Sequence, residues 1–273
     1  MKNCSIIVNG FYTNPSIEYQ TSTLVREFDR LGVAASVLKS GDFNVYLGGK
    51  EAFCGVKGDF IVYLDKDVHT ALMLEKGGFR LFNSANAIAV CDDKMLTHVA
   101  LLGSGINMPV TVSSPLNYYG EDGGSFLETV EKIIDYPVVV KEVYGSMGAG
   151  VFLAKNRSEL IALREKLIKK PHIYQQFIGE GGEDIRVIVI GGKAVAAMKR
   201  KNASDFRSNV SRGGSGFPVD LDDEVRFIAE KSAETLGLDY GGIDVLRGKE
   251  GTYYFCEANS NAFWSGIEKV SGV

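Results

Sequence analysis

Two strand-like segments near the end of the chain constrain its fold more than any other feature. Residues 241–247 and 253–261 are rich in β-branched and aromatic residues, and a polar turn that contains Gly248 and Gly251 separates them. Such segments joined by a glycine-containing turn predict an antiparallel β-hairpin. We therefore expect this part of the chain to lie within a β-sheet.

Three side chains that carry oxygen ligands interrupt the hairpin. Glu257 and Asn259 are two residues apart and point to the same side of their strand, and a register that pairs Asp244 with Glu257 brings the aspartate there too. Mg²⁺ usually takes one or two carboxylates with substrate phosphates, and it relieves the repulsion between buried carboxylates. Two interpretations stay open at this point: a Mg²⁺ site, or a solvent-facing hairpin with scattered polar residues.

The composition argues against several classes of partner. With 273 residues, 45% of them hydrophobic and 23% charged, the chain can bury a large core divided over two or three lobes. Its net charge of −4 gives no indication of nucleic acid or an anionic membrane, and its apolar runs are too short for a membrane span or a signal peptide. The four cysteines form no Cys-x-x-Cys pair and the three histidines are isolated in sequence. We therefore expect a cytoplasmic protein with reduced thiols, and the histidine spacing supports neither a metal site nor a catalytic triad.

The front of the chain alternates strand and helix patterns. Strands are predicted at residues 4–8, 33–38, 60–64 and 80–82, with helices at 17–31 and 68–76. This order predicts a small parallel α/β domain over residues 1–90. The first connection, residues 9–16, has no Gly-x-Gly-x-x-Gly fingerprint, so its polar residues either face a cleft or form a simple loop.

A glycine-rich stretch marks the middle of the chain. Helices are predicted at residues 92–102, with Asp92 or Asp93 as the cap and Lys94 in the first turn, and at 125–134 and 159–169. Strands are predicted from Pro109 and at 137–141, 151–154 and 172–178. Gly145, Ser146, Met147 and Gly148 lie between two of these strands, unlike a P-loop, which leads into a helix. They predict a flap whose backbone amides approach phosphate oxygens, with Lys141 adding a charge, or else a flexible hairpin turn.

The last third carries a concentration of positive charge. After a glycine linker at residues 179–182 we expect a hairpin of residues 184–190 and 193–201, then helices at 224–236 and 263–270. From the end of this hairpin onward, residues 199–212 place five cations against a single acid, Asp205, with Asn209 among them: Lys199, Arg200, Lys201, Arg207 and Arg212. Such a cluster suits a polyanionic ligand; a solvated loop or a nucleic-acid patch is the alternative, the latter disfavoured by the net negative charge.

Taken in order, these motifs strongly resemble those of the ATP-grasp ligases, and within them the RimK-like group that joins amino acids to a carboxylate. The resemblance covers about residues 90–270. It rests on Lys94, Val-Val-Val-Lys141 with Gly-Ser-Met-Gly-Ala-Gly-Val, Gln175-Gln-Phe-Ile178, Asp184-Ile-Arg, Ala-Met-Lys-Arg-Lys, Asp205-Phe-Arg-Ser-Asn, Arg212-Gly-Gly, Gly-Ile-Asp244-Val and Glu257-Ala-Asn259. The Asp-Phe-Arg-Ser-Asn run with Arg212-Gly-Gly is specific to the RimK-like group, whereas the separated lysines and the acid-x-Asn pair are general to ATP-grasp proteins.

The resemblance implies a role for each matching residue. Lys94 and Lys141 would bind phosphates beneath the flap formed by Gly145, Ser146, Met147 and Gly148, and Lys199 would also contact ATP. Gln176, Phe177 and Ile178 would form the hinge that contacts adenine, and Asp184 would lie near the ribose. Asp244, Glu257 and Asn259 would hold Mg²⁺, or Mn²⁺ in its place. Arg207, Asn209 and Arg212 would face the triphosphate end and the acyl phosphate.

The implied architecture is an ATP-grasp fold in which two α+β lobes clamp ATP, preceded by the small parallel-sheet α/β domain. Its parts would be residues 1–90, a central lobe with the flap at 91–178, and a C-terminal lobe with the metal site at 179–273. The implied reaction joins an amino-acid amine such as glutamate to a carboxylate acceptor through an acyl phosphate. The acceptor would be a small molecule, a peptide or a protein C-terminus, without nucleic acid or membrane, and a homo-oligomer is compatible with this.

Two alternatives and two departures accompany this interpretation. A peptide-modifying ligase would share every ATP motif, and a non-catalytic ATP-binding module would tend to lose a metal ligand or the Arg-Ser-Asn run. RimK relatives commonly have a proline and a glycine soon after the metal asparagine, where this chain has residues 260–264, Ser-Asn-Ala-Phe-Trp. The chain also ends earlier than the resemblance leads us to expect. The acceptor pocket is therefore not carried over.

Overall fold

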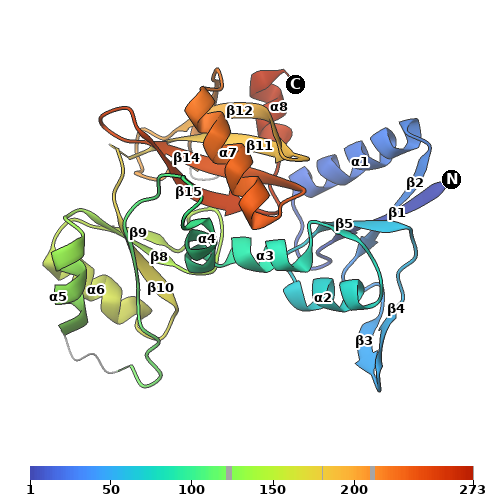
Figure 1. Ribbon diagram of the computed structural model, residues 1–273, viewed down its shortest axis with the longest axis horizontal. Coiled ribbons are helices and arrows are strands. Elements are labelled where there is room, and N and C mark those ends of the chain that lie inside the picture. Colours follow the sequence, from blue (N-terminus) through green and yellow to red (C-terminus); the bar gives the residue numbers. More distant parts are fainter. Residues whose placement is uncertain (121–124, 180, 210–212, 273) are drawn as a thin grey trace.

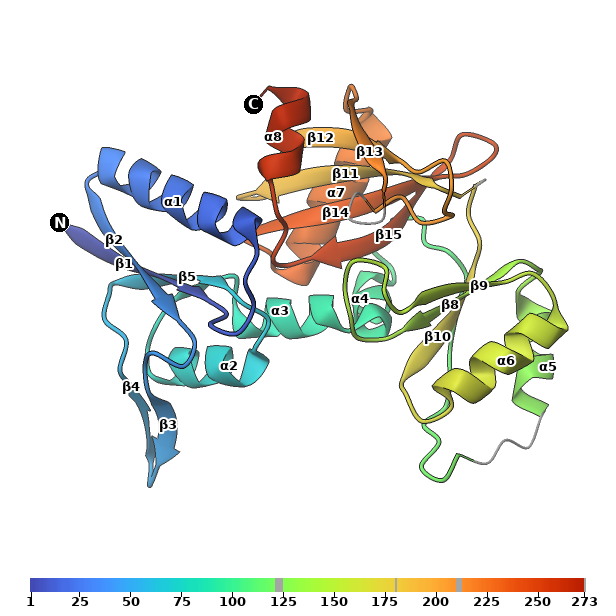
Figure 2. The same cartoon turned by 180° about the vertical axis from the view of Figure 1, so that it is seen from behind.

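The computed structural model describes residues 1–120, 125–179, 181–209 and 213–272. In these residues the strands form three larger sheets and one separate hairpin. Figures 1 and 2 show the N-terminal and central sheets at opposite ends of the molecule, with the C-terminal sheet and helices α3 (Ala85–Asp92) and α4 (Lys94–Leu101) between them. No helix in the described part of the chain is long and apolar enough to cross a membrane.

The N-terminal sheet is parallel, as predicted. Its order is β2 (Val33–Lys39), β1 (Lys2–Val8), β5 (Phe60–Leu64) and β6 (Leu81–Phe82). Helices α1 (Pro15–Arg30) and α2 (Val68–Lys76) connect the strands, and side-chain caps from Asn14 and Asp67 fix where these helices begin. The sequence patterns missed the hairpin of β3 (Val45–Gly48) and β4 (Glu51–Cys54).

The central sheet is antiparallel, in the order β7 (Thr111–Ser113), β10 (His172–Gln176), β8 (Val138–Glu142) and β9 (Val151–Ala154). Val138 and Val140 point toward helices α5 (Ser125–Ile133) and α6 (Arg157–Leu167) and are fully buried with them. Since side chains alternate along a strand, Val139 and Lys141 face the other way. The predicted glycine-rich connection between two strands is confirmed, because it joins β8 to β9.

The C-terminal sheet has the order β13 (Ser215–Pro218), β12 (Lys193–Lys201), β11 (Glu183–Ile190), β14 (Tyr240–Arg247) and β15 (Tyr253–Asn259). Its pairs are antiparallel, and the predicted register of Asp244 opposite Glu257 is confirmed. Ile243 and Val245 pack with helix α7 (Asp223–Leu236) in the largest buried cluster. Asp244 therefore points to the opposite face, on which helix α8 (Ser265–Ser271) also packs.

Of the two caps predicted for the helix at residues 92–102, Asp92 and Asp93, the second is confirmed. Asp93 is the cap of α4: its backbone is extended and its side chain accepts a hydrogen bond from the Leu96 amide. Asp92 instead ends α3, which the pattern analysis missed. Cys91 and Leu101 from the two helices join the buried cluster of the C-terminal sheet, and the fixed break between the helices presents Lys94 in the first turn of α4.

Candidate active site

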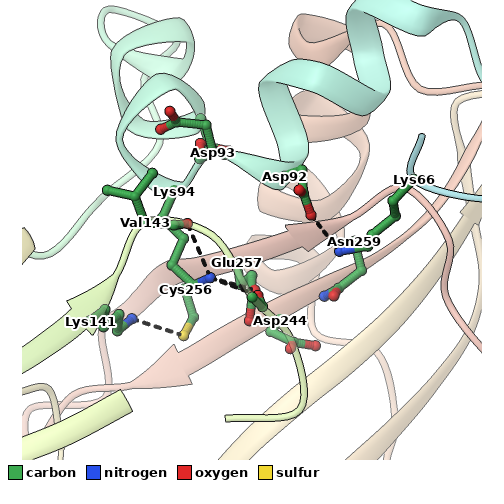
Figure 3. A network of polar contacts seen from close by, with 12 residues as sticks. Lys66, Asp92, Asp93, Lys94, Lys141, Val143, Asp244, Cys256, Glu257 and Asn259 are labelled. Atoms are coloured by element: carbon green, nitrogen blue, oxygen red, sulfur yellow. Dashed lines mark hydrogen bonds and ion pairs between the residues drawn. The ribbon is translucent and has the colours of Figure 1, made fainter. Parts of the chain in front are cut away.

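Two lysines from separate parts of the chain reach the β14–β15 hairpin, which itself carries two carboxylates (Figure 3). Asp244 and Glu257 lie opposite each other in the ladder, next to a bulge after Asp244. Asp244 is 3% exposed, whereas Glu257 and Asn259 are only partly buried. Lys94 enters from α4 and Lys141 from β8, so two lysines that are far apart in sequence meet the same two strands.

Lys94 ties the glycine-rich connection to the hairpin. Its Nζ donates hydrogen bonds to the carbonyl oxygens of Gly145, at 2.9 Å, and Val143, at 3.4 Å. The same nitrogen lies 3.6 Å from Glu257 Oε1. The amine is therefore held at the boundary between the glycine-rich loop and the carboxylate of β15, where a phosphate chain could bridge the two.

Lys141 is almost completely buried beside the same strand. Its Nζ lies 4.0 Å from the Cys256 Sγ, and its residue is 8% exposed. Burial raises the pKa of the Cys256 thiol to about 11, so this group is neutral near pH 7 and does not compete for the lysine charge. In the described part of the chain, the Lys141 side chain therefore forms no ion pair with a carboxylate.

Two arginines hold Asp244, an arrangement that the sequence analysis did not foresee. Arg186 Nε and NH2 each lie 2.6 Å from one carboxylate oxygen, and Arg200 NH2 lies 2.9 Å from Oδ2. Burial alone would raise the pKa of Asp244, but the two guanidinium groups outweigh it and the pKa lies below its ordinary range. Asp244 is therefore ionised, and each of its oxygens already accepts a charged hydrogen bond.

Arg200 also binds Asp184, so one guanidinium joins two aspartates. Its Nε donates to Asp184 Oδ1 at 2.7 Å and its NH2 contacts Asp184 Oδ2. The cross-strand pairs Asp184 with Arg200 and Arg186 with Asp244 bring these four side chains together on β11, β12 and β14. The predicted hairpin about Gly191 and Gly192 could have indicated the first pair, but nothing local indicates the second, because it depends on β14 lying beside β11.

The predicted excess of positive charge over residues 199–212 is wrong, because acids of the adjacent strand pair with three of these cations. Lys199 and Lys201 contact Glu183 oxygens at 2.6 and 2.5 Å, and Arg200 is buried against the aspartates. The acids that pair with these cations, Glu183 and Asp184, lie outside residues 199–212, on the adjacent strand β11. Arg207 pairs with Asp205, as the sequence allows. Arg212 lies outside the described residues.

Arg207 connects the C-terminal lobe to the glycine-rich loop. Its NH1 donates to the carbonyl oxygens of Gly148, at 2.9 Å, and Val151, at 3.1 Å. Met147 at φ 56° and Gly148 at φ 68° both adopt left-handed backbone conformations. Such conformations are unfavourable for a residue with a side chain, and they cluster at ligand-binding loops. Asn209 lies two residues after Arg207, in the connection between β12 and β13, and its carbonyl oxygen accepts a hydrogen bond from the Gly214 amide.

A cavity of about 490 Å³ lies at the predicted hinge. Gln176, Phe177 and Ile178 line it together with Tyr136 and the β14–β15 turn. The two lysines and the hairpin carboxylates are not among its lining residues, so it extends away from the charged centre. The structure thus brings the predicted hinge residues to a hollow at the junction of the central and C-terminal sheets.

The residues present fit a magnesium ion with phosphate ligands. The described part of the chain holds no group of three or more His, Cys, Asp or Glu side chains that could bind a metal by itself. Mg²⁺ needs no such cage, because it commonly takes one or two carboxylates and completes its shell with water and substrate phosphates. Glu257 is accessible for this, Asn259 adds an amide on the same side, and Asp244 has lone pairs beyond those that the arginines use.

Behind the site lies a buried histidine, His98, whose position could not be inferred from its spacing in the sequence. Its Nε2 lies 2.7 Å from Gln175 Nε2, whose amide also donates to Thr111 Oγ1. Burial, and then the charge of Lys141, lowers the pKa of His98 to about 4. The imidazole is therefore neutral under ordinary conditions and acts as a hydrogen-bond acceptor between α4 and β10.

This burial predicts a loss of stability in acid. Between pH 6.5 and about 4 only the unfolded chain takes up the His98 proton, so the free energy of unfolding falls by about 3 kcal/mol over that interval. We expect His98→Gln to remove this part of the acid destabilisation. Urea unfolding measures the free energy of unfolding of both proteins. The value for the variant minus the value for the wild type should rise by roughly 2 to 3 kcal/mol when the pH is lowered from 7.5 to 4.5. Exposed His69→Gln is the control, and parallel pH profiles for all three proteins would contradict the prediction.

Comparison with known proteins adds independent information. Residues 91–273 match the model of the RimK-like ATP-grasp domain. The chain is 31% identical over 267 residues to an uncharacterized protein MG012 homolog of Mycoplasma pneumoniae, covering 96% of this chain and 92% of that protein. It is 34% identical over 212 residues to human beta-citrylglutamate synthase B, covering 77% and 54% of the two chains. It is 38% identical over 197 residues to a probable alpha-L-glutamate ligase of Mannheimia succiniciproducens, covering 70% and 62%.

The chain spans about half the length of the beta-citrylglutamate synthases. Among solved structures, the ATP-grasp ligase PsnB complexed with a minimal precursor superposes with a TM-score of 0.73 at 19% identity, covering 100% of this chain and 95% of that one. D-alanine–D-alanine ligase from Bacillus anthracis gives a TM-score of 0.73 at 18% identity, covering 97% and 88%. Identities this low show a shared fold and no more.

Proposed function

Because the chain belongs to the family of RimK-like ATP-grasp ligases, we propose that it adds an amino acid, glutamate in the first instance, to a carboxylate acceptor. The family joins a carboxylate to an amine at the expense of ATP. One observation carries the proposal for this chain: Asp244, Glu257 and Asn259 share one side of a hairpin that Lys94 and Lys141 approach from two other elements.

In the proposed reaction the acceptor carboxylate attacks the γ-phosphorus of ATP, which gives an acyl phosphate and ADP. The amine then attacks the acyl carbon, the tetrahedral intermediate collapses, and inorganic phosphate leaves. Phosphoryl transfer of this kind depends on charge neutralisation and in-line positioning more than on a protein nucleophile. The side chains gathered at this site are of the required types.

Lys94 and Lys141 are proposed to bind the phosphates. Lys94 already donates to flap carbonyls, so phosphate oxygens would replace acceptors that the flap now supplies. Mg²⁺ or Mn²⁺ bound at Asp244, Glu257 and Asn259 would neutralise charge on the phosphate chain. Arg207, with Asn209 and Arg212, is proposed to stabilise the transferring phosphoryl group, and its hydrogen bonds to the carbonyls of Gly148 and Val151 would couple it to flap position.

The nucleoside end of ATP is proposed to lie at the hinge. Gln176, Phe177 and Ile178 line the cavity there, which supports backbone contacts to adenine. Asp184 is proposed near the ribose, although its carboxylate already binds Arg200, so a ribose hydroxyl would use the lone pairs that remain. Lys199, paired with Glu183 at 2.6 Å, is proposed as a further contact to ATP.

A division into three parts accompanies this proposal: residues 1–90, 91–178 and 179–273. Each part contains one of the three larger sheets, which supports the division. Cys91 and Leu101 nevertheless pack with the C-terminal sheet, so α4 would move with that sheet when the central lobe opens or closes. Lys94 would then stay with the hairpin while Lys141 moves with the flap.

The decisive experiment is a product search with the purified chain. We expect ADP release to require ATP, Mg²⁺, an amino acid and a carboxylate together, with citrate and N-acetylaspartate as the first carboxylates because of the relatives' names. Mass spectrometry should detect a product that is heavier than the carboxylate by the amino acid less one water. ADP release and amide formation only with peptides would indicate the peptide-modifying alternative. Nucleotide binding with no ADP release from any mixture would indicate a non-catalytic module and refute the proposal.

A further inference from the structure

The strand order of the N-terminal sheet contains the reversal at which parallel α/β folds bind ligands. The chain leaves β1 for β2 on one side and later places β5 on the other, so the direction of winding reverses between β1 and β5. Ligands bind outside the carboxyl ends of parallel strands at such a reversal. Asn9 follows β1 there, and Asp65 and Lys66 follow β5.

The backbone at this reversal is fixed by a buried aspartate. Asp65 accepts hydrogen bonds from Asn9 Nδ2 at 3.2 Å, Ser40 Oγ at 3.2 Å and the Lys66 amide at 2.7 Å. Asp65 is 7% exposed, and its carboxylate joins the loops that follow β1, β2 and β5. The backbone of Lys66 is therefore held by Asp65, while its side-chain amine extends away from that carboxylate toward Asp92.

The reversal adjoins the strand that carries the proposed metal ligands. Asn261 Nδ2 donates to the carbonyl oxygen of Leu64 at 2.8 Å, and Gln20 Nε2 of α1 donates to the carbonyl of Ala262 at 2.9 Å. These bonds hold residues 260–262, directly after Asn259, against the carboxyl end of β5. The N-terminal sheet therefore forms a wall of the same site.

Lys66 is the cation that this wall contributes. Its Nζ lies 2.7 Å from Asp92 Oδ1, and the two side chains are 35% and 25% exposed. Asp92 ends α3, two residues before Lys94. Lys94 in turn lies 3.6 Å from Glu257, and Figure 3 shows Lys66 and Asp92 on the other side of the labelled hairpin residues from Lys141. The amine thus lies near the site of phosphoryl transfer, opposite the lysine proposed for ATP.

We propose that Lys66 binds a second carboxylate group of the acceptor, which makes this a site for di- and tricarboxylates. This inference rests on the proposed function. The reacting carboxylate must reach the γ-phosphate at Glu257 and Asn259, and ATP occupies the side of Lys141 and the hinge. The acceptor enters from the N-terminal wall, where its remaining carboxylate meets the Lys66 ammonium. Asp92 competes for that ammonium and so holds Lys66 in place while weakening the binding of singly charged anions.

The test compares two substitutions with opposite expected effects. Lys66→Met removes the ammonium and should weaken binding of citrate and N-acetylaspartate by roughly tenfold or more, the usual size of a charged hydrogen bond. Asp92→Asn removes the competing carboxylate and should strengthen that binding. Binding is measured by calorimetry with Mg²⁺ and a non-hydrolysable ATP analogue, so it needs no turnover. A pair with only a structural role would make both substitutions weaken binding alike.

Kinetics supply the second measurement. In Lys66→Met the KM for the polycarboxylate should rise while kcat and the KM for ATP stay within about twofold, and Lys66→Arg should recover part of the loss. Lys50→Met, on the exposed β3–β4 turn, is the control for removing a lysine. Equal citrate and N-acetylaspartate binding by wild type and Lys66→Met, or no binding by either, overturns the inference. Failure to form an amide while Lys66 and Asp92 still alter binding in opposite directions would instead overturn only the proposed function.

Discussion

Replacing Glu257 by glutamine is expected to lower the rate of ATP turnover by about a hundredfold or more. The substitution keeps the shape of the side chain but removes the negative charge that faces Lys94 at 3.6 Å and that we propose binds the metal. Metal coordination at a transferring phosphoryl group supplies several kcal/mol of charge stabilisation, and each 1.36 kcal/mol is a tenfold change in rate. ADP release should be followed at saturating ATP over a range of Mg²⁺ concentrations.

The fold of this variant should be intact, because Glu257 is partly exposed and its partner Lys94 keeps its hydrogen bonds to the carbonyls of Val143 and Gly145. Glu165→Gln, on the exposed side of α6, is the matched control and should turn over ATP like the wild type. If raising Mg²⁺ restores part of the rate of Glu257→Gln, the loss is one of metal affinity. A rate within threefold of the wild type at every Mg²⁺ concentration would remove Glu257 from the proposed metal site.

Replacing Arg200 by methionine is expected to destabilise the protein by about 3 to 5 kcal/mol. Arg200 is 4% exposed and binds both Asp184 and Asp244, so its loss leaves Asp184 buried without a cation and Asp244 with Arg186 alone. Uncompensated buried charge is among the few mechanisms by which a single substitution has so large an effect. Urea unfolding near pH 7 measures the change.

The neighbouring Lys201 provides a strict control for this prediction. It also pairs with a carboxylate, Glu183, but its side chain is 53% exposed, so Lys201→Met should change the free energy of unfolding by less than about 1 kcal/mol. Removing the stranded charge as well, in Arg200→Met/Asp184→Leu, should recover part of the lost stability. Equal effects of the Arg200 and Lys201 substitutions would show that the buried cluster is not what holds β11, β12 and β14 together.

The sequence by itself determined those features whose signal is local. Apolar residues alternating on either side of a glycine-containing turn fixed the β14–β15 hairpin, and its register followed from which residues must share a face, which puts Asp244 opposite Glu257. Helix patterns were local too: the order of strands and helices predicted over residues 1–82 is that of β1, α1, β2, β5, α2 and β6, because apolar spacing belongs to each element alone. The glycine-rich loop was predictable in the same way, since its flanking strands are continuous apolar runs.

Only the tertiary structure decided how these pieces meet. Arg186 and Asp244 are 58 residues apart and pair because β14 inserts beside β11, a choice that neither strand's pattern contains. The positive charge read along residues 199–207 is balanced by Glu183 and Asp184 from the adjacent strand. Lys66 reaches Asp92 because α3, which packs in the core of the N-terminal sheet through Ala85 and Ile88, ends at Asp92. Periodicity records which side of an element is buried, whereas the partner of a charge depends on which elements become neighbours, and that is settled by packing of the whole chain.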